Sequence, residues 1–186
     1  TVEKLACGSY HVFALGLDGD VYMWGDNINV FPNGLRNLSR PTLFPYLSLE
    51  DLASGSDHLI GLTRSCRVYS WGSNYHGQLG LGDHNDRDTP TLIPELRLVK
   101  IYCGMSMSIG VTSGNEYYVW GSNFFHQLSS SVNGDYLESP TLLSKGDVQL
   151  LTYKFHRDCN CHDGDVSGTF YIHNHNLLKK IGLGSD

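Results

Sequence analysis

Hydrophobic residues along the chain occur in short runs separated by polar and glycine-containing turns. Within residues 1–50 the runs cover 5–7, 11–17, 21–24 and 42–44, and Asp18-Gly19 separates the second run from the third. Asp-Gly between two such runs is typical of a two-residue β-hairpin, and β-branched and aromatic residues favour strands. No segment of about 10–15 residues has helical periodicity. The pattern therefore predicts four short antiparallel strands.

The same pattern recurs twice more. Each unit has a Trp-Gly pair at the end of its third run, at Trp24, Trp71 and Trp120, so the period is 47 and then 49 residues. Two further anchors keep the same order: Cys7-Gly8, Ser54-Gly55 and Cys103-Gly104 upstream, and Pro41-Thr42-Leu43, Pro90-Thr91-Leu92 and Pro140-Thr141-Leu142 downstream. Four short strands in such a unit form a propeller blade or a solenoid unit. We expect the tryptophans, and small side chains such as Cys7 and Cys103, to be buried at equivalent positions.

The second unit carries the fullest motif, with Gly-Ser-Asp-His at 55–58, Trp-Gly-Ser-Asn at 71–74 and Gly-Gln-Leu-Gly-Leu-Gly-Asp at 77–83. This combination resembles the repeat of the regulator of chromosome condensation family, and the resemblance extends over residues 2–145. The third unit has Met107 in place of the histidine, and the first has residues 30–33 in place of the glycine-rich segment. The resemblance implies an all-β, seven-bladed propeller, of which this chain supplies about three and a half four-stranded antiparallel blades.

A fourth, degenerate repeat is detectable in the C-terminal part. Shifting the second unit by 102 positions aligns Tyr171 with Tyr69, and it places His173 where the tryptophan was. We expect this blade to be the least stable, and we expect the remaining blades to come from the same chain or another one, because an open propeller leaves bare strand edges. A short solenoid is the alternative. The predicted blades, all in one domain, are residues 1–52, 53–101, 102–147 and the incomplete 148–186.

Composition narrows the range of functions. Thirteen basic and nineteen acidic residues give a formal net charge of −6, which disfavours a broad nucleic-acid surface because such surfaces neutralise phosphates. No run of about 18 apolar residues is present, so no membrane span is expected. Five cysteines at irregular spacing fit a reducing, intracellular setting, cytoplasmic or nuclear, better than a disulfide framework.

Motifs for catalysis and for cofactors are missing from the sequence. It has no nucleophile elbow, no zinc-protease motif, no phosphate-binding loop and no kinase signature, so we expect no catalytic residues and no cofactor. A weak zinc candidate is the set Cys159, Cys161, His162 and His173, whose spacing differs from that of structural zinc sites. The acidic loop at 83–88 superficially resembles a calcium loop but lacks its central glycine and terminal glutamate.

Two functions remain open. The first is a protein-binding module, because propeller loops bind partners while the strands form a scaffold. The second, implied by the family resemblance, is guanine-nucleotide exchange on a Ran-type small GTPase, through short loops that carry acidic and histidine residues. The candidate partner-binding residues are Tyr10, His11, Asp57, His58, Ile28, Val30 and Phe31. The in-register His11 and His58 fit a repeated core hydrogen bond better than a binding site, and the apolar loop residues fit packing against a neighbouring blade better than a binding patch.

Overall fold

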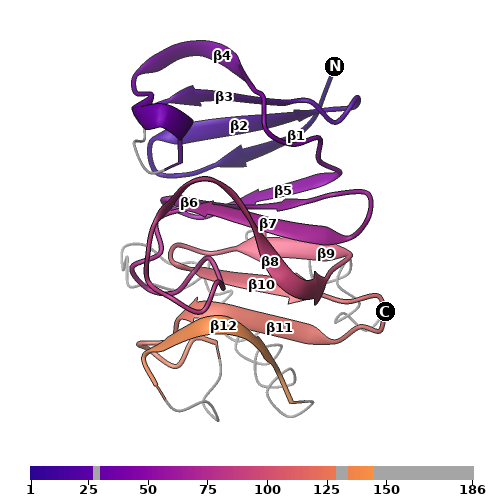
Figure 1. Ribbon diagram of the computed structural model, residues 1–186, viewed down its shortest axis with the longest axis vertical. Helices are drawn as coiled ribbons and strands as arrows, with labels where there is room; N and C mark the ends of the chain where they lie inside the picture. Colours follow the sequence, from indigo (N-terminus) through magenta and orange to yellow (C-terminus); the bar gives the residue numbers. More distant parts are fainter. Residues whose placement is uncertain (27–29, 129–133, 145–186) are drawn as a thin grey trace, which may run out of the picture. The chain divides into compact units, whose positions relative to one another are not determined.

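The computed structural model describes residues 1–26, 30–128 and 134–144, which contain three four-stranded antiparallel sheets (Figure 1). Consecutive strands pair within each sheet. The first sheet comprises β1 (Val2–Cys7), β2 (His11–Gly16), β3 (Val21–Gly25) and β4 (Leu38–Phe44). The second comprises β5 (Asp51–Ser54), β6 (His58–Leu62), β7 (Arg67–Gly72) and β8 (Arg87–Arg97), and the third β9 (Lys100–Cys103), β10 (Met107–Val111), β11 (Tyr117–Ser122) and β12 (Tyr136–Leu142). The predicted strands and the predicted repeat are confirmed.

Regular structure outside the sheets is sparse in the described residues. A single 3₁₀ turn, η1 (Pro32–Gly34), lies between β3 and β4. No helix in this part of the chain is long and apolar enough to cross a membrane. The second and third sheets begin at Asp51 and Lys100, two residues before the boundaries expected from the sequence.

The three sheets belong to one compact unit, Thr1–Leu143. The predicted fourth blade at 148–186 and the zinc candidates Cys159, Cys161, His162 and His173 lie outside the described residues.

Strand pairing gives each sheet two distinct faces. One face carries the tryptophan, and we call it the tryptophan face. In the first sheet this face has two rows of residues that are paired across the strands. One row is Leu5, Ala14, Tyr22 and Leu43, and the other is Cys7, Val12 and Trp24. The opposite face of the first sheet carries Ala6, Phe13, Leu15, Val21, Met23 and Phe44. Both faces are therefore largely apolar, which is typical of a sheet that is covered on both sides.

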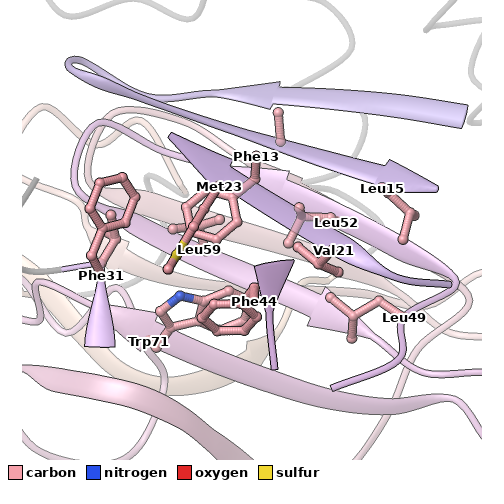
Figure 2. Close-up of a cluster of buried hydrophobic side chains, with 12 residues drawn as sticks. Phe13, Leu15, Val21, Met23, Phe31, Phe44, Leu49, Leu52, Leu59 and Trp71 are labelled. Atoms are coloured by element: carbon pink, nitrogen blue, oxygen red, sulfur yellow. The ribbon is translucent and has the colours of Figure 1, made fainter. Parts of the chain in front are cut away.

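The core lies between the sheets. Trp71, on the tryptophan face of the second sheet, packs against the opposite face of the first (Figure 2). Its ring stacks on Phe44 with the centroids 5.3 Å apart and meets Phe13 edge-on at 6.1 Å. A second core cluster lies between the second and third sheets. There, Trp120 of the third sheet packs with Ile60 and other residues of the second sheet. Each of these two tryptophans thus packs on the sheet that precedes it.

Trp71 and Trp120 are fully buried, as predicted, whereas the prediction was wrong for Trp24 and for Cys7. Trp24 is only partly buried and Cys7 is exposed. The physical reason is the packing direction, because no sheet among the described residues precedes the first one and covers its tryptophan face. Cys103, at the equivalent position in the third sheet, is partly buried and packs against the second core cluster, and desolvation raises the pKa of its thiol to about 12.

Candidate partner-binding site

Two sets of loops leave the sheets at one end. Because every strand reverses direction, the loop between the first and second strands of a sheet and the loop between its third and fourth strands emerge on the same side. We call this side the loop end; it includes η1, at the left of Figure 1. The loops joining first to second strands are residues 8–10, 55–57 and 104–106, and the others join β3 to β4, β7 to β8 and β11 to β12. Five large apolar side chains at the loop end are more than half exposed: Tyr10, Tyr75, Met105, Phe124 and Phe125.

Backbone hydrogen bonds join the short loops of neighbouring sheets. The Ser9 amide donates to the Ser56 carbonyl at 3.0 Å, and the Ser56 amide donates to the Met105 carbonyl at 3.0 Å. Gly72, at the end of β7, lets this strand approach the loop at residues 55–57 closely. It has a φ of 106°, and a Cβ at this position would lie 2.5 Å from the Asp57 carbonyl oxygen. The loops bearing Tyr10 and Asp57 therefore have fixed positions relative to the strands.

His11 and His58 lie beneath the loop end and link adjacent sheets. His11 Nε2 is 2.9 Å from Ser54 Oγ, and His58 Nε2 is 3.0 Å from Ser108 Oγ. Both rings are buried, and burial lowers the pKa of His11 to about 4 and that of His58 to about 3. They are uncharged at neutral pH. The predicted repeated core hydrogen bond is confirmed, and neither ring is accessible to a partner in this structure.

Val30 and Phe31 pack against the neighbouring blade, as the sequence favoured, and so they cannot belong to an exposed binding patch. Both are fully buried in the core between the first and second sheets. The Phe31 ring lies 6.0 Å from that of Phe13 and 6.4 Å from that of His11. Val30 Cγ1 approaches Gly72 of the next sheet, just as Gln78 approaches Gly121. The segment thus fills the space that the Gly-Gln-Leu-Gly segment fills one sheet later.

The remaining members of the sequence-predicted set differ in accessibility. Tyr10 is strongly exposed and Asp57 is partly buried, and both lie at the loop end. Leu35, in the same loop as Val30, is exposed. Ile28 lies outside the described residues.

Two buried asparagines hold the loops that follow the third strands. Asn74 Oδ1 accepts a hydrogen bond from the Leu79 amide at 2.9 Å, and its Nδ2 donates to the Asp83 carbonyl at 2.7 Å. Asn123 accepts from the Leu128 amide at 3.0 Å and donates to the Gly134 carbonyl at 3.1 Å. Each asparagine fixes a loop from within.

An exposed aromatic residue directly follows each of these asparagines. Tyr75 follows Asn74, and Phe124 follows Asn123. Phe125 stands next to Phe124, with the ring centroids 5.2 Å apart. Sequence reasoning missed these tips, although their constant position after a repeated asparagine was a signal that could have found them.

Tyr75 belongs to a group of polar and aromatic side chains that links the second sheet to β12. His84 lies 2.8 Å from Glu138 Oε1 and 3.0 Å from the Tyr75 carbonyl oxygen. The His76 ring packs against Tyr75 and Tyr136, with centroids 5.0 Å and 5.3 Å away. Partial burial lowers the pKa of His76, and the nearby His84 lowers it further.

The acidic loop at 83–88 is held by protein contacts. Arg87 donates a hydrogen bond to Asp83 at 2.6 Å, and this bond is the main cause that lowers the pKa of the Asp83 carboxyl. The Asp86 carboxylate accepts a hydrogen bond from the backbone amide of Asn74 at 2.7 Å. Within the described residues no three histidine, cysteine, aspartate or glutamate side chains form a group that could hold a metal ion.

Comparison with known protein families identifies the repeated unit. The regulator of chromosome condensation (RCC1) repeat matches residues 67–111, and a second description of the same repeat matches residues 2–29 and 50–78. The chain carries RCC1 repeats. Each of the three sheets is accordingly one blade of a β-propeller, and the described residues form a partial propeller.

Solved structures with this fold include human WBSCR16 and yeast RCC1, Prp20. Human WBSCR16 has 25% identity and a TM-score of 0.65, and the match covers 77% of this chain and 39% of that one. Prp20p from Saccharomyces cerevisiae has 21% identity and a TM-score of 0.69, with 80% of this chain and 39% of that chain covered. Prp20 bound to Kap60 gives 20% identity and a TM-score of 0.70, with 80% and 38% covered. The RCC1 blades of this chain thus span about two fifths of the length of these structures. No curated protein matches the chain in sequence.

Proposed function

We propose that the RCC1 blades form a non-catalytic protein-binding module whose partner docks on the loop end. The observation that carries this proposal is the gathering of five exposed apolar side chains, Tyr10, Tyr75, Met105, Phe124 and Phe125, on loops at one end of the blades. Large aromatic side chains provide much of the binding energy in protein interfaces, and exposed apolar groups of this size favour a partner.

The rigidity of the loops supports the same proposal. Tyr75 and Phe124 follow buried asparagines that fix the loop backbone, and the loop of Tyr10 is hydrogen-bonded to that of the next blade. A surface that is already ordered loses little conformational entropy on binding. Asp57 adds a carboxylate at this end, whereas His11, His58, Val30 and Phe31 support the loops from the core.

Guanine-nucleotide exchange on a Ran-type small GTPase is the second candidate function. It is favoured by the structural likeness to Prp20p, a protein described together with its binding properties to Gsp1p and histones. The sequence of the Ser56-Asp57-His58 loop also fits it. Exchange would need polar groups that reach the nucleotide site, and His58 is buried and uncharged here. We therefore place binding without exchange first.

We infer an intracellular setting and no cofactor for this module. The described cysteines Cys7, Cys66 and Cys103 are free thiols, which suits a reducing compartment. The net charge of −6 favours a protein partner over direct nucleic-acid binding.

Site-specific photocrosslinking tests the docking surface. The photoreactive residue benzoylphenylalanine replaces Phe125 at the loop end, and in a matched control it replaces Leu17, which is similarly exposed at the opposite end. We expect a discrete crosslinked protein from position 125 that disappears when Tyr75→Ser and Phe124→Ser are added. Equal crosslinking from position 17, or crosslinking that survives both substitutions, would show that the loop end is not the docking surface.

A further inference from the structure

The hairpin turns opposite the loop end differ in charge from blade to blade. The turn between the second and third strands of each sheet emerges on the side away from the loop end, because neighbouring strands run in opposite directions. We call this side the turn end; it lies opposite η1 in Figure 1. In the second blade the turn is formed by residues 63–66, between β6 and β7. Arg64 in this turn and Arg67 directly after it are both exposed.

Arg67 occupies a repeat position that is acidic in the other two blades. Its carbonyl closes the hairpin by accepting a hydrogen bond from the Thr63 amide at 3.0 Å. The carbonyls of Asp20 and Glu116 close the hairpins of the first and third blades in the same way, at 2.8 Å and 3.0 Å. The hairpin therefore forms without a basic residue at this position, and the arginine distinguishes the second blade from its two neighbours.

An extension of the outer strand brings a third arginine to the same place. β8 has 11 residues, whereas β4 and β12 have 7 each. The extension ends at Arg97, which is exposed and pairs with Arg67 in the register of the two strands. Leu96 is buried in the second core cluster, and the Leu98 amide donates to the Cys66 carbonyl at 3.2 Å. The backbone on both sides of Arg97 is thus held in place.

The pairing of two arginines does not stabilise the folded chain by itself. Residues that pair across antiparallel strands point to the same face, and like charges directly opposite each other are destabilising. Arg97 Nη1 donates a hydrogen bond to the Leu96 carbonyl at 3.1 Å. Across residues 1–26, 30–128 and 134–144, no carboxylate forms an ion pair with Arg64, Arg67 or Arg97. Their positive charge is uncompensated within these residues, and it favours the binding of an anion.

We propose that Arg64, Arg67 and Arg97 bind a phosphorylated segment of a protein partner, at the end of the blades opposite the proposed docking surface. A phosphomonoester has a charge of about −1.5 to −2 at neutral pH and three oxygens that accept hydrogen bonds. The planar arginine side chain binds such oxygens in pairs. Three guanidinium groups on one hairpin match the charge and the oxygens of a single phosphoryl group, whereas a carboxylate has only two oxygens and one charge.

The surroundings favour a compact anion over an extended one. Exposed carboxylates flank the arginines: Asp18 and Asp20 lie at the turn end of the first blade, Glu116 lies at that of the third, and Glu95 lies in β8 itself. A nucleic-acid backbone or an anionic membrane surface would bring further negative charges against these carboxylates. A single phosphoryl group on a peptide meets the arginines without that repulsion.

NMR titration of the full chain tests this proposal. The probe is the peptide acetyl-Ala-Ala-phosphoserine-Ala-Ala-amide, and the same peptide with serine or glutamate at the central position serves as the control. The signals of the arginine Nε–H groups, assigned with single Arg→Gln variants, report binding and the dissociation constant. The test variant carries Arg67→Gln and Arg97→Gln. Its matched control is Arg40→Gln, which replaces an exposed arginine of β4.

We expect the phosphopeptide to shift the signals of all three arginines in a saturable way. The double variant should bind it about tenfold more weakly or worse, because charge-assisted hydrogen bonds are lost, while Arg40→Gln should bind it as the parent chain does. Absence of binding, or equal binding of the glutamate peptide, would overturn the proposal.

Three further probes identify other occupants. They are inorganic phosphate, a short single-stranded DNA and vesicles that contain a phosphoinositide. If any of them binds the three arginines at least as tightly as the phosphopeptide, the site takes a free anion, a nucleic acid or a membrane, and the proposal is wrong. Weaker binding of all three supports a phosphorylated protein segment.

Discussion

At the residue scale, the three tryptophans show that one repeat position can contribute unequally to the free energy of unfolding. Trp71 and Trp120 are enclosed between their own sheet and the preceding one, whereas no described sheet covers the face that carries Trp24. The sequence predicts equal burial because it repeats the residue. It cannot predict the difference, since burial depends on whether a preceding blade is present.

Truncation of these tryptophans should therefore have unequal costs. We expect Trp71→Ala to lower the free energy of unfolding by about 3–5 kcal/mol, because a buried aromatic ring leaves a cavity. Trp24→Ala should cost less than about 1.5 kcal/mol, since its ring is already partly in water. Urea unfolding of the two variants measures both values. Equal losses would mean that Trp24 is enclosed in solution.

The buried histidines predict a loss of stability on acidification. The pKa is about 3 for His58 and about 4 for His11 in the folded state, against about 6.5 when unfolded. Between these values the unfolded chain binds more protons, so stability is full above pH 6.5 and falls as the pH drops towards 4. The slope is at most about 1.4 kcal/mol per pH unit for each histidine.

His58→Gln separates this effect from other titrations. Glutamine can still reach Ser108 but takes up no proton, so the variant should be less sensitive to the change from pH 7 to pH 5 than the parent protein. The urea midpoints of both proteins at the two pH values supply the comparison. An identical pH dependence would exclude His58 as the titrating group.

At the element scale, the strands and turns follow from local sequence, while the loops do not. The alternating runs, the Asp18-Gly19 hairpin and the strand containing Thr42 are all found where the sequence places them. Val30 and Phe31 read as loop residues, yet they are core residues because the next blade receives them. The exposed tips at Tyr75 and Phe124 depend on asparagine contacts that span several residues, which strand periodicity does not encode.

Removal of one asparagine should loosen its own loop first. We expect Asn74→Ala to cost about 1–3 kcal/mol, because the Leu79 amide and the Asp83 carbonyl lose a partner. Hydrogen exchange at the Leu79 amide should accelerate more than exchange in β6. Asn85→Ala, at an exposed position of the same loop, is the control. Equal acceleration throughout the second blade would contradict a local role for Asn74.

At the scale of the whole molecule, repeat spacing predicted either a propeller blade or a solenoid unit, since three anchors recur in constant order. The resemblance of the second unit's motif to a known repeat family favoured the propeller. The proposed docking surface could be predicted only in part. Tyr10 and Asp57 lie at the loop end, while four other candidates, His11, His58, Val30 and Phe31, are buried beneath it. Charge and composition favour a protein partner, but they contain no information on which loop residues reach the surface.

Fluorescent-nucleotide release from a Ran-type GTPase tests most directly the claim that these blades do not catalyse exchange. The chain is added to the GTPase loaded with a labelled nucleotide, alongside a variant carrying Tyr10→Ala and Asp57→Ala. Both substituted side chains lie at the loop end and outside the buried core, so the fold should be retained. We predict that the nucleotide leaves at its intrinsic rate in every mixture. Release that the chain accelerates well above that rate, and that the double variant no longer accelerates, would contradict this account and establish exchange as the function of the loop end.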